Sequence, residues 1–204
     1  IVQFDAVGAG LAQVKTLTQA SAGGGTVDLG GADSITAADG AKTIIGGDLA
    51  DTVSMGSGVH TVLGDNGLLT YVAMGRVGAG NLLALETTDT LPATGGDDIV
   101  VAGNGENLIA TGMGADRVTT SRGSDVILGD NGIILRDPTG SFLDAITSTV
   151  TLEGGDDTIV AGDGSKTVVA GIGSDEVRLG TGTHVVLADN GFLDYSRSGI
   201  LGFV

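Results

Sequence analysis

Apolar and polar positions recur along most of this chain with a period of nine residues. The period is clearest in GGDDIVVAG, NGENLIATG, MGADRVTTS and RGSDVILGD, which follow one another over residues 95–130. In each unit a polar residue stands two positions after a glycine, and a branched aliphatic residue follows two positions later. Glycine permits the backbone angles of a tight turn, and β-branched residues favour strands. Each unit therefore predicts one turn followed by one short strand.

Two consecutive nonapeptides, 18 residues, complete one coil of a solenoid, with turns on two opposite sides. Each strand of one coil then lies beside the equivalent strand of the next coil, so successive coils pair as parallel strands. The predicted fold is all-β: a parallel β-roll, or β-solenoid, of nonapeptide repeats that is interrupted by β-hairpins.

The nonapeptides form three blocks, residues 30–71, 95–136 and 154–195, which align with one another without gaps. Near its end each block carries the tripeptide Asp-Asn-Gly, and beyond the block the period is lost. We interpret these tripeptides as turns that lead into hairpins rather than as ligands, because Leu69, Ile134 and Leu193 stand at the ligand phase that follows them.

The segments outside the blocks predict hairpins, because apolar runs flank turn-forming residues such as those at 75–80 and 137–140. The chain is thus predicted to be a single array, with hairpins at 1–29, 72–94 and 137–153 and a partial hairpin at 196–204. The Phe and Tyr residues lie in the hairpin strands, so we expect the hairpins to cover faces or edges of the roll through hydrophobic contact.

Composition and charge narrow the possible partners. The chain has 25 acidic and 9 basic residues, a net charge of −16, and no cysteine. This charge argues against nucleic acid and anionic membranes and favours cations. No run approaches the roughly 18 apolar residues of a membrane span, so no membrane insertion is expected. Without disulfides, metal ions or the stacking of coils must stabilise the fold.

The order Gly-x-Asp-x-aliphatic resembles the RTX, or haemolysin-type, calcium-binding repeat G-G-x-G-x-D-x-U-x. The first glycine of that pattern is often alanine here, as in Ala102-Gly103-Asn104-Gly105. The blocks also resemble those of long bacterial surface and adhesin proteins that punctuate such repeats with G-D-N-G. The resemblance implies Ca²⁺ between neighbouring turns on one side of the roll, held by an aspartate from each coil and by carbonyls of the glycine-rich turns.

Transferred to this chain, the resemblance requires aspartates 18 residues apart, and carboxylates on a flexible glycine backbone suit calcium. Three pairs meet this requirement: Asp33 with Asp51, Asp98 with Asp116, and Asp157 with Asp175. Backbone carbonyls near Gly112, Gly114, Gly171 and Gly173 are expected to complete two of the sites. Leu49 replaces a turn glycine at the first pair.

The opposite row of turns departs from the family pattern. Its ligand phase is occupied by Lys42, His60, Asn107, Asp125, Lys166 and His184. A lysine ammonium cannot ligate calcium, but it can neutralise a nearby carboxylate such as that of Asp39 or Asp163. We therefore predict metal on one side of the roll only, with Asn107 and Asp125 as an exception. The two histidines are interpreted as turn residues.

The sequence contains no nucleophile elbow, P-loop or HExxH motif, so we do not expect an enzyme. The leading hypothesis is a calcium-binding structural segment of a secreted or cell-surface bacterial protein, such as an adhesin stalk or a matrix component. One alternative is a calcium-independent filament subunit that associates head to tail. Another is the secretion or folding tail of an RTX enzyme or toxin. A glycan- or ice-binding face would need clustered aromatics or a threonine ladder, and neither is evident.

Overall fold

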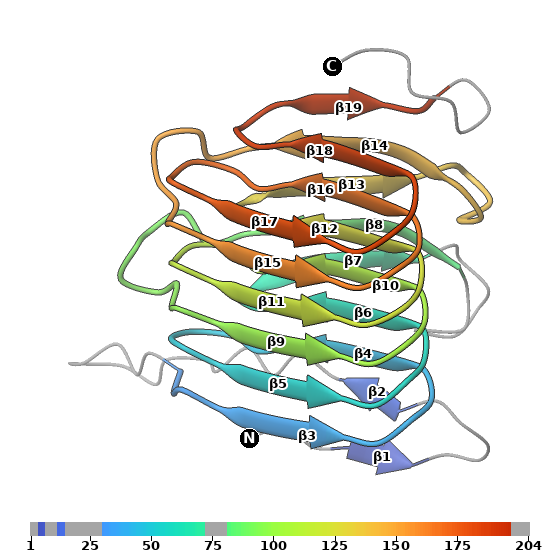
Figure 1. Ribbon diagram of the computed structural model, residues 1–204. Coiled ribbons are helices and arrows are strands. Elements are labelled where there is room, and N and C mark those ends of the chain that lie inside the picture. Colours follow the sequence, from blue (N-terminus) through green and yellow to red (C-terminus); the bar gives the residue numbers. More distant parts are fainter. Residues whose placement is uncertain (1–3, 7–11, 15–29, 72–80, 197–204) are drawn as a thin grey trace.

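The computed structural model describes residues 4–6, 12–14, 30–71 and 81–196, and this part of the chain folds into strands without helices. It contains no helix long and apolar enough to cross a membrane. Two parallel sheets of six strands form a roll (Figure 1). The front sheet consists of β3 (Ser34–Ala37), β5 (Thr52–Met55), β9 (Ile99–Ala102), β11 (Arg117–Thr120), β15 (Thr158–Ala161) and β17 (Glu176–Leu179). The middle sheet consists of β4 (Lys42–Ile45), β6 (His60–Leu63), β10 (Asn107–Ala110), β12 (Asp125–Leu128), β16 (Lys166–Val169) and β18 (His184–Leu187).

The chain alternates between these two sheets, so that each coil contributes one strand to each of them. All strand pairs within the two sheets are parallel and in register, as in the pairing of Val118 with Val100 and with Ile159. The aliphatic residue of each nonapeptide points into the space between the sheets, where Val100, Ile109 and Ile127 are completely buried. The predicted parallel β-roll is confirmed, and the sheets do not close into a barrel.

The hairpins form a third layer. Strands β7 (Gly67–Tyr71), β8 (Leu82–Thr87), β13 (Gly132–Arg136), β14 (Leu143–Ser148) and β19 (Phe192–Asp194) pair in this order as an antiparallel hairpin sheet. Its apolar side chains, including Leu85, Ile134 and Ile146, pack on Leu63 and Leu128 of the middle sheet. The hairpins thus cover one face of the roll, as expected. The sequence did not indicate that successive hairpins pair with each other, as β8 does with β13.

Two short strands near the N-terminus, β1 (Phe4–Ala6) and β2 (Ala12–Val14), form an antiparallel pair. This pair lies within the hairpin predicted at 1–29. The rest of that segment lies outside the described residues, as do the predicted turn at 75–80 and residues 197–204 of the partial C-terminal hairpin.

The roll has two edges at which the chain turns from one sheet to the other. At the first edge the chain passes from the middle sheet to the front sheet, for example over residues 46–51 and 111–116. At the second edge it passes from the front sheet to the middle sheet, for example over residues 121–124 and 162–165. The hairpins depart from the first edge and return to it, so the coils remain stacked.

Candidate metal centre

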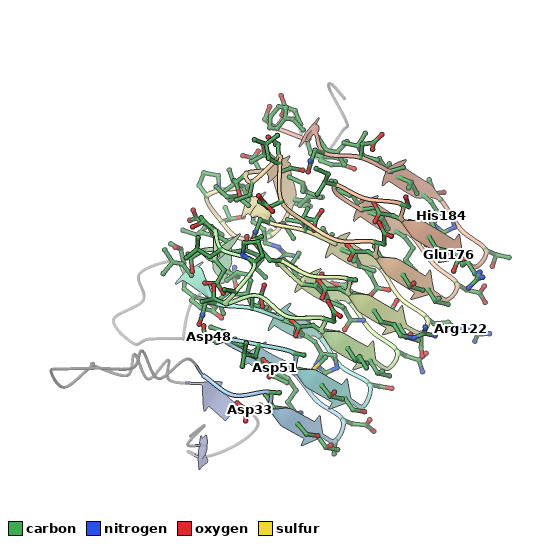
Figure 2. The ribbon with its side chains drawn as sticks, turned by 90° about the vertical axis from the view of Figure 1, so that its left-hand side faces the viewer. Asp33, Asp48, Asp51, Arg122, Glu176 and His184 are labelled. Atoms are coloured by element: carbon green, nitrogen blue, oxygen red, sulfur yellow. The ribbon has the colours of Figure 1, made fainter. Side chains whose placement is uncertain are left out.

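Six aspartates form a continuous column along the first edge. They are the aspartates predicted as ligands: Asp33, Asp51, Asp98, Asp116, Asp157 and Asp175. Within each predicted pair, the backbone N–H of one aspartate donates to Oδ1 of the next, for example from Asp98 to Asp116 at 2.7 Å and from Asp157 to Asp175 at 2.9 Å. Figure 2 looks onto this edge, where Asp33 and Asp51 lie on neighbouring coils.

The column also continues across the hairpins. The N–H of Asp51 donates to Oδ1 of Asp98 at 2.7 Å, and the N–H of Asp116 donates to Oδ1 of Asp157 at 2.8 Å. These partners are 47 and 41 residues apart in the sequence. A repeat spacing of 18 residues does not reveal these pairs, because a hairpin lies between the two partners in the sequence. The alignment of the three blocks with one another was the sequence signal that could have revealed them.

The second oxygen of these carboxylates is left without a partner. Oδ2 is buried and accepts no hydrogen bond in five column members: Asp51, Asp98, Asp116, Asp157 and Asp175. Buried polar atoms are normally satisfied, so each such oxygen calls for a ligand. Burial raises the pKa of Asp51 to about 6 and that of Asp98 to about 7. Burial, reinforced by the charge of Asp116, raises the pKa of Asp157 to about 9.

At three steps of the column a glycine lets the unpartnered oxygen and a carbonyl oxygen approach so closely that a Cβ would not fit. A Cβ on Gly46 would lie 2.2 Å from Oδ2 of Asp51 and 2.2 Å from the carbonyl oxygen of Gly64. A Cβ on Gly64 would lie 2.1 Å from Oδ2 of Asp98 and 2.6 Å from the carbonyl oxygen of Thr111. We call these places, together with the one below, the glycine gaps.

The third glycine gap lies at Gly129, where a Cβ would be 2.2 Å from Oδ2 of Asp157 and 2.2 Å from the carbonyl oxygen of Ala170. Each gap thus brings a carboxylate oxygen and a carbonyl oxygen of the following coil to one small space. Hard cations such as Ca²⁺ prefer this type of donor. The residues present therefore fit calcium.

The equivalent step at Thr111 is filled by a side chain. The Thr111 hydroxyl donates a hydrogen bond to the carbonyl oxygen of Gly129. Burial raises the pKa of Asp116 well above its usual value. At this step a threonine hydroxyl therefore occupies the place beside the carboxylate and carbonyl oxygens that no side chain occupies at the three glycine gaps.

The turn glycines of the first edge have the backbone angles that the repeat requires. Gly112, Gly114, Gly171 and Gly173 have positive φ, between 109° and 138°. Leu49, which replaces a turn glycine, also has a positive φ of 70°. The first turn therefore keeps its left-handed bend despite the leucine. The carbonyls of the four glycines remain predicted ligands.

The aspartates of the Asp-Asn-Gly tripeptides anchor the points where hairpins leave the roll. Oδ2 of Asp65 accepts from the N–H of Met113 at 2.6 Å, and Asp130 accepts from the N–H of Ile172. Burial raises the pKa of Asp65 to about 9, with a smaller contribution from the charges of Asp98 and Asp116. The sequence assigned these residues to turns but missed that they add buried carboxylates to the first edge.

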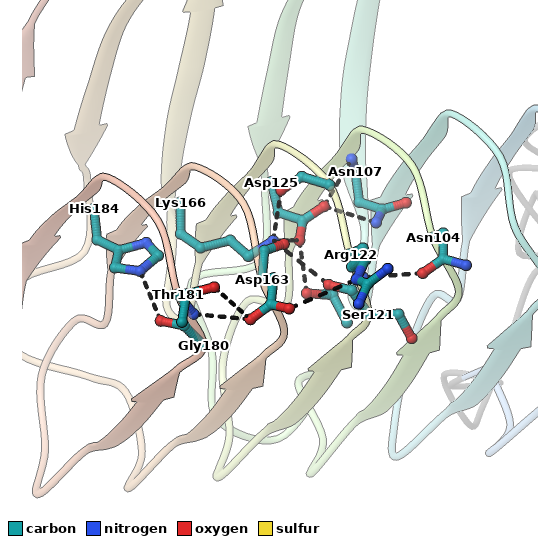
Figure 3. A network of polar contacts seen from close by, with 12 residues as sticks. Asn104, Asn107, Ser121, Arg122, Asp125, Asp163, Lys166, Gly180, Thr181 and His184 are labelled. Carbon is teal, nitrogen blue, oxygen red and sulfur yellow. Dashed lines mark hydrogen bonds and ion pairs between the residues drawn. The ribbon is translucent and has the colours of Figure 1, made fainter.

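The second edge holds its polar residues in a different way (Figure 3). Oδ1 of Asp125 accepts from Asn107 Nδ2 at 2.8 Å, and Oδ2 accepts from Thr120 Oγ1 at 2.7 Å and contacts Lys166 Nζ at 2.8 Å. Both oxygens of Asp125 are thus engaged, and the expected exception of Asn107 with Asp125 offers no free carboxylate to a metal.

The predicted carboxylate partners of the lysines were wrong. Lys42 Nζ contacts the backbone carbonyl of Asp39 at 2.9 Å, and Lys166 neutralises Asp125 instead of Asp163. The carboxylate of Asp163 accepts from Thr181 instead. The histidines, predicted to be turn residues, begin strands β6 and β18, and their side chains contact the preceding turns: His60 Nε2 and His184 Nε2 each lie 3.0 Å from the carbonyl oxygen four residues earlier.

Among the described residues, no group of three or more Asp, Glu, His or Cys side chains is arranged to hold a metal ion. An ion at the first edge would therefore depend on backbone carbonyls as well as carboxylates. This is the donor set that the repeat pattern implies.

Comparison with known proteins agrees with this geometry. A family model of the RTX calcium-binding nonapeptide repeat matches residues 92–127, 111–132 and 150–183, in four copies. No curated protein and no solved structure matches the chain. The matched residues include Asp98, Asp116, Asp157 and Asp175 of the aspartate column. The resemblance inferred from the sequence is confirmed for this part of the chain.

Proposed function

Because residues 92–183 carry RTX calcium-binding nonapeptide repeats, we propose that the chain is a structural segment stabilised by Ca²⁺ bound along its first edge. The proposed ligands are the six column aspartates and the turn carbonyls, including those of Gly112, Gly114, Gly171 and Gly173. We place the segment outside the cell or on a bacterial surface, as an extender, stalk or matrix element.

The unpartnered carboxylate oxygens of the column carry this proposal. Five buried Oδ2 atoms on one edge accept no hydrogen bond, and three of them face a glycine gap. Without a cation, ionising these carboxylates would place like charges in a buried row. A calcium ion would neutralise adjacent carboxylates and use the carbonyl oxygen of the next coil.

Calcium would then join neighbouring coils of the roll. An ion that binds only the folded chain stabilises it by RT ln(1 + [L]/Kd). Each coil of a solenoid contacts only its neighbours, so its stiffness depends on each successive interface. Extracellular modules bind calcium with Kd values of about 10⁻⁴–10⁻³ M, which would let the segment stiffen on leaving the cell.

The proposal is tested by thermal unfolding of the chain, followed by circular dichroism, over free calcium from micromolar to millimolar. We expect the unfolding midpoint to rise with calcium and Asp157→Asn to reduce that rise. Asp39→Asn is the matched control, because Asp39 lies on the second edge, is exposed, and accepts the N–H of Ser57, which an asparagine can also accept. An unfolding midpoint that does not depend on calcium would contradict the proposal.

Head-to-tail self-association is a second candidate. Strands β3 and β4 end the two parallel sheets on one side, and β17 and β18 end them on the other. Such strand edges can pair with another chain. Sedimentation velocity over a range of protein concentrations tests this, with and without calcium. A monomer at all concentrations would rule out self-association but leave the calcium proposal intact.

A further inference from the structure

Lys166 is a buried charge on the second edge, outside the aspartate column. It begins strand β16 of the middle sheet, and its side chain is completely buried. Long charged side chains are almost never fully buried unless they are paired. The surroundings of its ammonium must therefore replace the water that the group has lost.

Four oxygen atoms surround the ammonium of Lys166 (Figure 3). Nζ lies 2.8 Å from Oδ2 of Asp125 and 2.6 Å from the carbonyl oxygen of Gly123. It also contacts the carbonyl oxygens of Asp163 at 3.2 Å and Ser121 at 3.5 Å. One carboxylate and three turn carbonyls therefore converge on a single positive charge.

These oxygens come from two neighbouring coils. Ser121 and Gly123 belong to the turn before β12, Asp125 begins β12, and Asp163 belongs to the turn before β16. The ammonium therefore joins adjacent turns through their carbonyls and one aspartate. At the first edge, the glycine gaps present the same kinds of oxygen, also from adjacent coils.

We infer that Lys166 is a tethered cation: its ammonium occupies a cation site made by Asp125 and three turn carbonyls, and it closes this part of the second edge without metal. Asp125 contributes one carboxylate to Nζ and the other three contacts are neutral carbonyl oxygens, so the site balances a single positive charge. Removing the side chain leaves a buried site for a small free cation.

Other members of the same row hold their turns with weaker versions of this contact. Lys42 Nζ lies 2.9 Å from the carbonyl oxygen of Asp39 and 3.0 Å from that of Gly40, and its side chain is only partly buried. His60 and His184 contact one turn carbonyl each. Protein nitrogen atoms thus bind turn carbonyls at four coils of this edge.

Cation rescue of Lys166→Ala in the full chain, at saturating calcium, tests the inference. We expect the thermal unfolding midpoint to fall by about 10 °C, because Asp125 is left as an unpaired buried charge. Ammonium chloride should recover part of this loss, whereas tetramethylammonium chloride at the same concentration should not.

A second variant keeps the test decisive if Lys166→Ala does not fold. Lys166→Met leaves Asp125 unpaired, and adding Asp125→Asn removes that charge. The double variant should therefore be more stable than Lys166→Met alone. Lys42→Met is the matched control and should shift the midpoint much less. The inference is overturned if Lys166→Ala is as stable as the original chain, or if Asp125→Asn worsens Lys166→Met and no cation restores either variant.

Discussion

At the scale of single residues, the two oxygens of every column aspartate except Asp33 have separate tasks. Oδ1 accepts a backbone N–H from the preceding coil and so holds the turns in register, as Asp116 does for Asp98 at 2.7 Å. Oδ2 remains buried and unpartnered. An asparagine could take over the first task but could not bind a cation as a carboxylate does. The two tasks can therefore be separated by one substitution.

Asp98→Asn is expected to change stability in opposite directions with and without calcium. In EGTA at about pH 8, above the Asp98 pKa of about 7, the variant should be more stable because a buried negative charge is gone. In saturating calcium the variant should be less stable, because a ligand is lost. Urea unfolding in both buffers measures this, and effects of the same sign in both would argue against a calcium-ligand role.

Thr111→Gly is expected to open a fourth glycine gap. The substitution removes the hydroxyl that donates to the carbonyl oxygen of Gly129. That carbonyl oxygen is then left facing the carboxylate of Asp116. Isothermal titration should then count one more calcium ion per chain than in the original protein. Thr119→Gly, on the neighbouring strand β11, is the control and should add none. An unchanged count in Thr111→Gly would show that these gaps do not set the calcium stoichiometry.

At the scale of elements, the hairpin sheet stabilises the roll by covering the middle sheet. The strands β6, β10, β12 and β16 of the middle sheet have buried side chains on both faces, one inside the roll and the other under the hairpins. Ile146 of β14 is completely buried between the hairpin sheet and the middle sheet, whereas Phe142 just before β14 is 66% exposed. The contribution of a hairpin residue to stability therefore depends on whether its side chain faces the middle sheet or the solvent.

Ile146→Ala should lower the free energy of unfolding by about 2–5 kcal/mol, because it leaves a cavity between the middle and hairpin sheets. Phe142→Ala, in the same hairpin but exposed, should change it by less than about 0.5 kcal/mol. Urea unfolding of the two variants in calcium provides the comparison. Equal losses would mean that the hairpin sheet does not pack on the roll as described.

The sequence predicted the coils well because their signal is local. Each nonapeptide contains its own turn glycine and its own inward aliphatic residue, such as Gly96 and Val100, so periodicity alone locates turn and strand. Pairing between successive hairpins has no such signal, because the four strands β9 to β12 separate β8 from β13 in the sequence. The contact of Lys166 with Asp125 was missed for the same reason, since a hairpin separates these neighbours in the sequence.

At the scale of the whole molecule, the two edges of the roll balance charge differently. The first edge collects buried carboxylates, whereas the second places lysine, histidine and asparagine beside its turn carbonyls. The net charge of −16 is therefore not spread evenly. Conditions that change the charge of carboxylates should act mainly through the first edge.

In EGTA, the chain should lose stability as pH rises from about 4 to about 9. Burial raises the pKa of Asp51, Asp98 and Asp157 from the usual 3.8 to about 6, 7 and 9. The folded chain therefore binds more protons than the unfolded chain in this range, and the free energy of unfolding falls with rising pH. Calcium displaces those protons, so its affinity should rise with pH. Urea unfolding across this range, with and without calcium, measures both trends, and a pH-independent calcium effect would contradict them.

The most direct test of the account is a crystal structure of the chain grown in calcium, with the ions identified by anomalous scattering. The account predicts ions along the first edge, about 2.3–2.6 Å from Oδ2 atoms of the aspartate column and from turn carbonyls, and none beside Lys166. Ions on the second edge, or a first edge without ions at saturating calcium, would contradict it.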